Sequence, residues 1–455
     1  MSCAARQPLP RCRSMTTPVT LPLWLFALIL AFAVVSFSTN FLFPSVRWFL
    51  RRRMERAVER LNRNLQYPIE PFKLLRRFDL IQRLVYDPEV SAAIVDHARA
   101  QGVREDVAFQ RARKYAREIV PSFSTLAYFG AGVRAARWLS NALYRVELRQ
   151  LDLDALGRID PQSTVVFVMN HRSNMDYVLV THLVADRSAL SYAVGEWARV
   201  WPLSRLIRSM GAYFIRRKNR DALYRRVLRR YVQMSTEGGV TQAIFPEGGL
   251  SLDGGLAPPK VGLLSYMVEA HAGMERDVVF VPVALNYDRV LEDTVLIRAG
   301  EAGTRRFEAH IGRVMLGILR MGWRRLWGRF HGFGTAAVTL GRPVSLREFE
   351  TSGDTADLAN VLMARIEEAI PVLPVPVMAQ KLLTGPQSLA ALQAAITEAG
   401  LTDPYFDETI DALQRRGVVT RQGDVLSLAA GAEPMARFYA RSIGKPDASA
   451  TRESR

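Results

Sequence analysis

The sequence predicts an α/β protein whose central, mostly parallel sheet is flanked by helices. Between residues 165 and 285, short runs rich in Val, Ile and Phe alternate with stretches of helical length. Short apolar runs of this kind are typical of strands buried on both faces, and their alternation with helices favours parallel pairing. Polar residues follow several of these runs directly, at the sheet edge where ligands collect in such folds.

Residues 1–20 form an N-terminal tail, and the apolar stretch over 21–43 is long enough to cross a bilayer. Arginines follow at 47, 51, 52, 53, 56 and 60, which favours a cytoplasmic location for the rest of the chain. The upstream arginines at 6, 11 and 13 weaken this orientation, and Met15 is an alternative start that would remove them. A cleaved signal peptide competes with this interpretation, but the apolar run continues past the small residues at 31–33. We therefore expect a retained single-pass helix in the cell (inner) membrane.

The segment 44–150 has apolar residues at helical spacing among many charges, so we expect a helical lead-in between the anchor and a catalytic domain. It contains no catalytic constellation. Its basic face is either solvated or in contact with anionic lipid headgroups.

We assign residues 151–370 to a catalytic domain built on the predicted sheet. Strands are expected at 165–169, 191–194, 212–215, 241–245, 278–285 and 336–340. Helices are expected at 176–185, 196–210, 220–233, 261–270 and 358–370.

The most informative polar residues are His171 and Asp176, which follow the first of these strands in an H-x4-D spacing. His171 lies just past the strand, and Asp176 falls near the first turn of the next helix. A carboxylate beside an imidazole fixes its tautomer and makes it a usable general base. Taken alone, the spacing also fits a helix-capping Asp and a surface His that never meet.

Two further strand ends are polar. Arg216, Arg217 and Lys218 follow one strand and suit a phosphate, although a solvated basic turn has the same composition. Glu247, Gly248 and Gly249 follow another, and the glycines permit unusual backbone angles and close approach of a ligand. An ordinary tight turn with a surface Glu is the alternative.

Composition narrows the classes of function. The formal net charge of +17 favours an anionic partner, which could be a nucleic acid, a phosphorylated metabolite or an anionic membrane surface. The two cysteines are Cys3 and Cys12, so the folded part has no disulfide, thiolate nucleophile or Cys-based metal site. The six histidines do not cluster as ligands would, which argues against a catalytic metal.

The C-terminal part is expected to form a small α+β domain over 371–444, with a hairpin near 415–428, before a disordered tail over 445–455. This outline is compatible with a winged helix, but its many carboxylates make a poor surface for phosphates, so we expect no nucleic-acid partner. A basic, Trp-bearing helix over 305–330 suits either an interfacial membrane contact or core packing.

In this order and spacing, four blocks resemble the glycerophospholipid acyltransferase family, in its glycerol-3-phosphate and dihydroxyacetone-phosphate acyltransferase branch. The likeness is concentrated between residues 151 and 292. The blocks are Asn-His-Arg-Ser-Asn-Met-Asp-Tyr (170–177), Gly-Ala-Tyr-Phe-Ile-Arg-Arg (211–217), Phe-Pro-Glu-Gly-Gly (245–249) and Val-Pro-Val through Tyr-Asp-Arg (281–289).

The resemblance implies that His171 is the general base and Asp176 its orienting partner, with no covalent acyl-enzyme, no cofactor and no metal. The co-substrate would be acyl-CoA or acyl-carrier protein, and the acceptor the sn-1 hydroxyl of glycerol-3-phosphate. The residues implied in acceptor binding are Arg172, Ser173, Arg216, Arg217, Lys218, Glu247, Gly248 and Gly249.

One departure keeps an alternative acceptor open. The family branch often has arginines just after Glu-Gly-Gly, where this chain has Leu250 and Leu252. These leucines, with Leu256, would instead suit the acyl tail of lysophosphatidate (1-acyl-glycerol-3-phosphate). A third interpretation is a membrane-tethered basic binding protein with no catalysis.

Overall fold

The computed structural model describes residues 22–37, 43–63, 65–151, 153–185, 187–195, 203–216, 220–303, 332–349 and 354–444. The chain divides into two compact units, Met1–Leu61 and Asn62–Arg455. The expected tail over 1–20, the basic helix over 305–330 and the tail over 445–455 lie outside the described residues.

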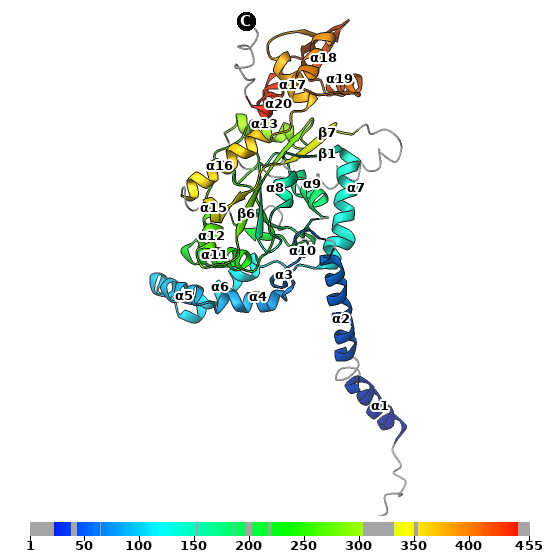
Figure 1. Ribbon diagram of the computed structural model, residues 1–455. Coiled ribbons are helices and arrows are strands. Elements are labelled where there is room, and N and C mark those ends of the chain that lie inside the picture. The colour runs from blue at the N-terminus through cyan, green and yellow to red at the C-terminus, as the bar shows by residue number, and fades with distance from the viewer. Residues whose placement is uncertain are drawn as a thin grey trace, which may run out of the picture. The chain divides into compact units, whose positions relative to one another are not determined.

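The first unit contains α1 (Leu23–Phe37) and most of α2 (Phe43–Asn62), both drawn in blue in Figure 1. The transmembrane helix predicted over 21–43 is not found in the structure. Helix α1 has 15 residues, whereas a spanning helix needs about 20. Across the described part of the chain, no helix combines the length and the apolar character that crossing a bilayer requires.

The second unit is built on an eight-stranded sheet with the order β1-β7-β6-β2-β5-β3-β4, and β8 pairs with β6. Pairing is parallel except where β6 meets β7 and β8, so the predicted, mostly parallel sheet is confirmed. The strands are β1 (Arg145–Gln150), β2 (Thr164–Met169), β3 (Ser191–Gly195), β4 (Tyr213–Ile215), β5 (Gln242–Ile244), β6 (Val278–Tyr287), β7 (Thr335–Leu340) and β8 (Val344–Ser345).

Both faces of the sheet are covered by helices, which explains why the strands are apolar without alternation. Along β2, Val165 and Phe167 belong to one hydrophobic core, and Val166 and Val168 belong to the other. The helices contributing to the second core are α4 (Arg77–Val85), α5 (Pro88–Gln101), α6 (Glu105–Ile119), α11 (Ala222–Glu237), α12 (Gly262–His271) and α16 (Thr355–Glu368). Those contributing to the first include α7 (Val133–Leu143), α8 (Leu153–Gly157), α9 (Met175–Val184) and α13 (Asp293–Glu301). Figure 1 shows α8 and α9 on one side of β6 and α11, α12 and α16 on the other.

The lead-in is helical as predicted up to Leu143, but its last residues are not. Residues 145–150 form β1, which pairs in parallel with β7 from far along the chain. The pattern over 44–150 did not separate this strand because its alternating charged residues resemble those of the preceding helices. The remaining short elements of the unit are α3 (Pro71–Leu74), η2 (Leu126–Gly132), α10 (Leu203–Ser209) and α15 (Leu346–Phe349).

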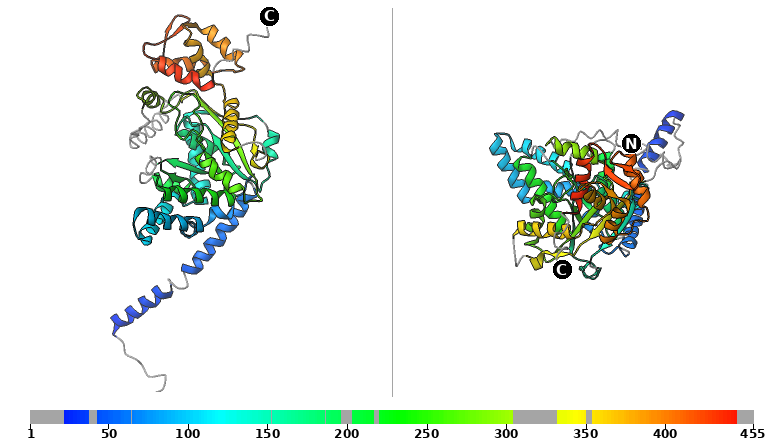
Figure 2. Two further views of the ribbon diagram at one scale, coloured as in Figure 1. Left: turned by 90° about the vertical axis from the view of Figure 1, so that its left-hand side faces the viewer. Right: turned by 90° about the horizontal axis from the view of Figure 1, so that it is seen from above.

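The C-terminal part contains four helices around a three-stranded sheet, and it is the orange and red part of Figure 2. Its antiparallel strands confirm the predicted hairpin. The elements are α17 (Pro374–Leu382), β9 (Gln387–Ser388), α18 (Leu389–Glu398), α19 (Phe406–Arg415), β10 (Val419–Gln422), β11 (Val425–Leu428), α20 (Glu433–Ala440) and η4 (Arg441–Ile443).

Asp288 connects the sheet to this C-terminal part. Its carboxylate accepts hydrogen bonds from the backbone N–H groups of Thr335 (2.8 Å) and Val375 (3.1 Å), which join the end of β6 to β7 and to the first turn of α17. Burial raises the pKa of Asp288 from an ordinary value of 3.8 to about 6.

This raised pKa predicts a pH-dependent stability. The folded state binds the Asp288 proton more tightly than the unfolded state, so the contribution is full below about pH 4 and is lost as pH rises through about 6. The shift corresponds to about 3 kcal/mol. We expect denaturant unfolding of the wild type and of Asp288→Asn to diverge by about this amount between pH 4 and pH 7.5. A constant difference in unfolding free energy across that range would contradict the assignment.

Candidate active site

The candidate site lies where three neighbouring strands end. Strand β2 is flanked by β5 and β6 in parallel register, so the residues that follow all three strands meet at one edge of the sheet. His171, Glu247 and Tyr287 come from these three ends. Arg216 follows β4, the last strand of the sheet order, and lies farther along the edge.

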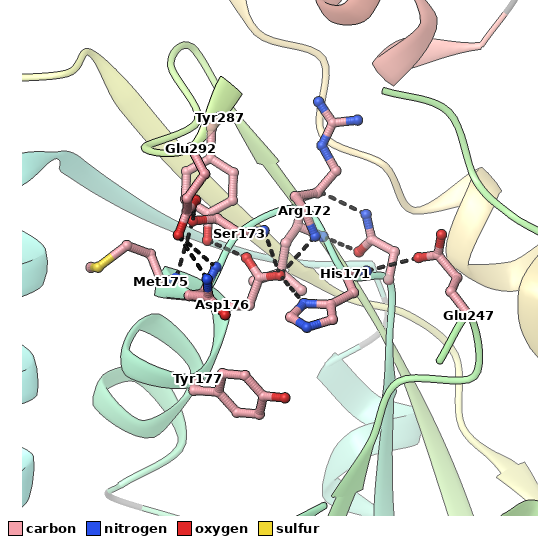
Figure 3. A network of polar contacts seen from close by, with 12 residues as sticks. His171, Arg172, Ser173, Met175, Asp176, Tyr177, Glu247, Tyr287 and Glu292 are labelled. Atoms are coloured by element: carbon pink, nitrogen blue, oxygen red, sulfur yellow. Dashed lines mark hydrogen bonds and ion pairs between the residues drawn. The ribbon is translucent and has the colours of Figure 1, made fainter. Parts of the chain in front are cut away.

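His171 and Asp176 are in direct contact, as the family resemblance implied. The imidazole Nδ1 lies 2.9 Å from Asp176 Oδ2, and both side chains are buried. The same carboxylate oxygen accepts the backbone N–H groups of Arg172 (2.7 Å) and Ser173 (3.0 Å). The other oxygen, Oδ1, accepts the Tyr287 hydroxyl at 2.6 Å. Figure 3 shows these donors converging on Asp176 from the loop and from β6.

This arrangement determines the tautomer of His171. Because a carboxylate that receives several donors acts as an acceptor, Nδ1 of the imidazole must provide the proton of their shared hydrogen bond. The lone pair is then on Nε2, which makes no hydrogen bond to any residue in the described ranges. A neutral imidazole oriented in this way can accept a proton at Nε2.

The rest of the His171 environment comes from β5 and α9. The backbone N–H of His171 donates to Glu247 Oε1 at 2.8 Å, and Ala257 N–H donates to Glu247 Oε2 at 3.0 Å. Burial raises the pKa of Glu247 above its usual range, while these donors oppose the rise. The imidazole stacks on Phe245, with 4.0 Å between ring centroids, and meets Tyr177 edge-on. Glu247 therefore fixes the backbone that presents His171.

Arg172 and Ser173 point away from the imidazole. The Arg172 guanidinium donates to the Gly254 carbonyl and lies 5.3 Å from the ring of Phe438 in α20. Its Nε and Nη2 have no hydrogen-bond partner among the described residues. Ser173 donates to Glu292 Oε2 at 2.7 Å and accepts the Met175 N–H. Arg172 and Ser173 therefore connect the loop after β2 to Gly254 and to Glu292.

Arg216 forms an ion pair within the protein. Its guanidinium donates two hydrogen bonds to the buried carboxylate of Glu118, at 3.1 and 2.6 Å, and lies over the rings of Tyr115 and Tyr224. The Glu118 hydrogen bond raises the pKa of Arg216 despite partial burial. The Arg216 guanidinium, which was expected to bind a phosphate, thus binds Glu118 of helix α6 instead. Arg217 and Lys218 lie outside the described residues.

Gly248 and Gly249 follow Glu247 in the turn after β5. Gly248 has a φ of +68°, which favours glycine, and a Cβ added there would lie 2.9 Å from Cδ and 3.1 Å from Nζ of Lys260. The Lys260 backbone N–H also donates to the Pro246 carbonyl. Lys260 is thus a cation beside this turn that the sequence pattern did not single out, because it stands eleven residues after Gly249 in a loop without a recognisable motif.

Sequence reasoning also missed Tyr287 and Glu292 as parts of the site. Tyr287 contacts Asp176, and Glu292 binds the Ser173 hydroxyl together with the N–H and side-chain amide of Asn174. The available signal was that Tyr287 belongs to the fourth block (281–289). From the sequence, however, a residue at the end of this strand could equally have a purely structural role. Within the described ranges, no cluster of three or more His, Cys, Asp or Glu residues could hold a metal ion.

Residues 151–286 match the family model described as Acyltransferase, so this part of the chain is an acyltransferase domain. The family resemblance drawn from the four blocks is thereby confirmed.

Within this class, the chain is similar to proteins named glycerol-3-phosphate acyltransferase. The protein from Aeromonas hydrophila subsp. hydrophila is 30% identical over 288 residues, covering 61% of this chain and 34% of that protein. The one from Shewanella amazonensis is 28% identical over 347 residues, covering 69% of this chain and 41% of that protein. The chain therefore matches less than half the length of these relatives.

Among solved structures, the crystal structure of the 1-acyl-sn-glycerophosphate (LPA) acyltransferase from Thermotoga maritima is similar at 19% identity. The match covers 53% of this chain and 77% of that one, with a TM-score of 0.33.

Proposed function

We propose that this protein transfers a fatty acyl group from an acyl thioester to the sn-1 hydroxyl of glycerol-3-phosphate in phospholipid biosynthesis. The observation that supports this most strongly is the buried contact between His171 Nδ1 and Asp176 Oδ2, which leaves Nε2 as the basic atom. The similarity to named glycerol-3-phosphate acyltransferases supports the acceptor.

In the proposed reaction, His171 Nε2 accepts the proton of the acceptor hydroxyl as the oxygen attacks the thioester carbonyl carbon. Asp176 stabilises the resulting imidazolium. The tetrahedral intermediate collapses with cleavage of the C–S bond, and the imidazolium returns its proton to the leaving thiolate. The reaction needs no acyl-enzyme, which agrees with the absence of cysteine after Cys12. The thioester donor is acyl-CoA or acyl-carrier protein.

The acceptor phosphate requires cations near this edge of the sheet. We propose Lys260, whose side chain lies beside the Gly248 turn, as a phosphate ligand, with Arg217 and Lys218 as further candidates. Ser173, Glu247 and Gly249 would then shape the loop and turn around the acceptor, and Arg172 would hold the loop from its other side.

Replacing Lys260 by alanine tests this assignment. We expect the KM for glycerol-3-phosphate to rise about tenfold, while the KM for the acyl donor changes little, because one charge-assisted contact to phosphate is lost. Lys381→Ala, at an exposed position on α17, is the matched control and should leave both values unchanged. Equal KM values for the acceptor in the two variants would remove Lys260 from the phosphate site.

An acceptor competition assay tests the function itself. The full chain is given palmitoyl-CoA or palmitoyl-acyl-carrier protein with glycerol-3-phosphate and lysophosphatidate together, and both products are quantified. We expect glycerol-3-phosphate to be consumed first, giving new lysophosphatidate, before phosphatidate forms from the added lysophosphatidate. Leu250 and Leu252, the proposed contacts for a lysophosphatidate tail, pack against the hydrophobic core, which favours the smaller acceptor. Exclusive acylation of added lysophosphatidate would establish the alternative acceptor, and absence of thioester consumption would favour a non-catalytic binding protein.

We further propose that the protein acts at the cytoplasmic face of the cell membrane, on an anionic lipid surface. Helix α1 exposes all but two of its side chains, most of them apolar, and exposed arginines of α2 follow it, among them Arg52, Arg53, Arg56 and Arg60. An apolar surface followed by a basic surface suits a bilayer interface with anionic headgroups. Co-sedimentation with phosphatidylglycerol vesicles at low and high salt tests this. Binding that is equal on neutral vesicles would contradict the role of the arginines.

A further inference from the structure

We call residues 170–176, between β2 and the first turn of α9, the catalytic loop. The segment 287–292, which begins at the last residue of β6, contacts this loop through its first and its last residue. Tyr287 donates its hydroxyl to Asp176 Oδ1 at 2.6 Å. Five residues later, Glu292 accepts the Ser173 hydroxyl at 2.7 Å, the Asn174 N–H at 3.2 Å and the Asn174 side-chain amide at 3.1 Å. Figure 3 shows Tyr287 and Glu292 together on one side of the loop, with His171 on the other.

We propose that Tyr287 is a positioning residue for acyl transfer, which acts by fixing the Asp176 carboxylate toward His171. This inference rests on the proposed role of His171 as general base. Tyr287 does not contact the imidazole, so its effect passes through Asp176.

The geometry of Asp176 explains why this hydroxyl matters. Oδ2 receives the imidazole and two backbone N–H groups, all from the loop itself, whereas Oδ1 receives Tyr287. Tyr287 is therefore the donor that ties the carboxylate to the sheet rather than to its own loop. Without it, the carboxylate can rotate about its Cβ–Cγ bond, and the imidazole loses its fixed orientation.

The Tyr287 hydroxyl can act only as a donor here. Burial and the neighbouring Asp176 raise its pKa well above the ordinary value, so it keeps its proton over the working range of pH. A hydrogen bond from a buried hydroxyl to a carboxylate is among the stronger side-chain contacts.

Tyr287 is itself rigidly held. Its ring lies against Tyr144, with 5.3 Å between centroids, and its N–H donates to the Asn286 side chain. The Tyr144 hydroxyl donates to the Arg289 carbonyl at 2.9 Å, and the Val290 N–H donates to Tyr439 of α20 at 3.0 Å. The segment that positions Asp176 is thus fixed on one side by the catalytic domain and on the other by the C-terminal helix.

The test is Tyr287→Phe, which keeps the ring and removes the hydroxyl. We expect kcat to fall about tenfold, while the KM values for both substrates stay within about twofold. The matched control is Tyr115→Phe, which removes a buried hydroxyl that donates to another carboxylate, that of Asp221 at 2.7 Å, and should retain kcat. Glu292→Gln, at the other end of the segment 287–292, alters the contacts to Ser173 and Asn174. This second variant should also lower kcat with little change in the KM values.

A readout independent of activity separates this inference from the proposed function. In protein with 15N-labelled histidine, the Nδ1–H of His171 should give a downfield proton signal that His171→Gln removes. Tyr287→Phe should shift or broaden this signal, and Tyr115→Phe should not. An unchanged signal together with an unchanged kcat overturns the positioning role. Loss of kcat that is fully accounted for by a lowered melting temperature, with the signal unchanged in the folded fraction, overturns it equally. A shifted signal in a protein that fails to acylate any acceptor would support the positioning and reject the function.

Discussion

His171→Gln should reduce acyl transfer by about a hundredfold to ten-thousandfold, because the reaction loses the group that removes the acceptor proton. Glutamine fills much of the same volume, and its amide nitrogen can donate to Asp176 as Nδ1 does, so the loop should remain folded. The measurement is release of free CoA from palmitoyl-CoA with saturating glycerol-3-phosphate.

The matched control for this variant is His97→Gln. His97 is also buried, on α5, and its ring nitrogen lies 3.0 Å from Arg111, outside the strand ends that form the site. We expect it to keep full activity. Retention of turnover in His171→Gln, at the rate of His97→Gln, would exclude His171 as the general base.

Asp176→Asn should lower kcat nearly as much, by about a thousandfold to ten-thousandfold, with little change in either KM. The four donors that converge on the carboxylate require an acceptor at both oxygens, and an amide supplies only one. If the amide nitrogen faces His171, it donates to the imidazole and places the proton on Nε2, where the base must be empty. The measurement is single-turnover acylation of radiolabelled glycerol-3-phosphate, so that slow product release does not mask the effect.

A suitable control is Asp221→Asn, which alters another, half-buried set of carboxylate contacts. Asp221 is the N-cap of α11, accepts the Tyr224 N–H at 2.7 Å and binds the Tyr115 hydroxyl. Because asparagine caps a helix about as well as aspartate, this replacement should keep the cap and should leave kcat unchanged. If Asp176→Asn and Asp221→Asn retain the same kcat, the carboxylate beside His171 is only structural.

The position of Arg216 changes how the basic run after β4 is interpreted. Its place after a strand suggested a phosphate ligand, yet Arg216 is paired with the buried carboxylate of Glu118. Glu118 belongs to the helical lead-in, about a hundred residues before its partner. The lead-in therefore completes the edge of the sheet beside β4 and is more than a connector.

The sequence pattern was enough to predict the α/β class and the strands from 165 to 285, whereas the pairing of His171 with Asp176 was expected from the family resemblance. The strands are local properties, since a strand buried on both faces is apolar over its own length. The C-terminal hairpin was predictable for the same reason. The apolar stretch at 21–43 is equally local, and the structure describes helix α1, of 15 residues, within it.

The distant residues that meet at the site are revealed by the folded chain and not by any local pattern. The tertiary structure assigned Arg216 to Glu118 and brought Tyr287 and Glu292 to the catalytic loop across more than a hundred residues. It also turned 145–150 into a strand, because β7 offers a parallel edge that the local pattern does not reveal. Hydrogen bonds between remote segments depend on the order and register of the strands. Strand order and register depend in turn on packing in both hydrophobic cores, to which many separate stretches of the chain contribute.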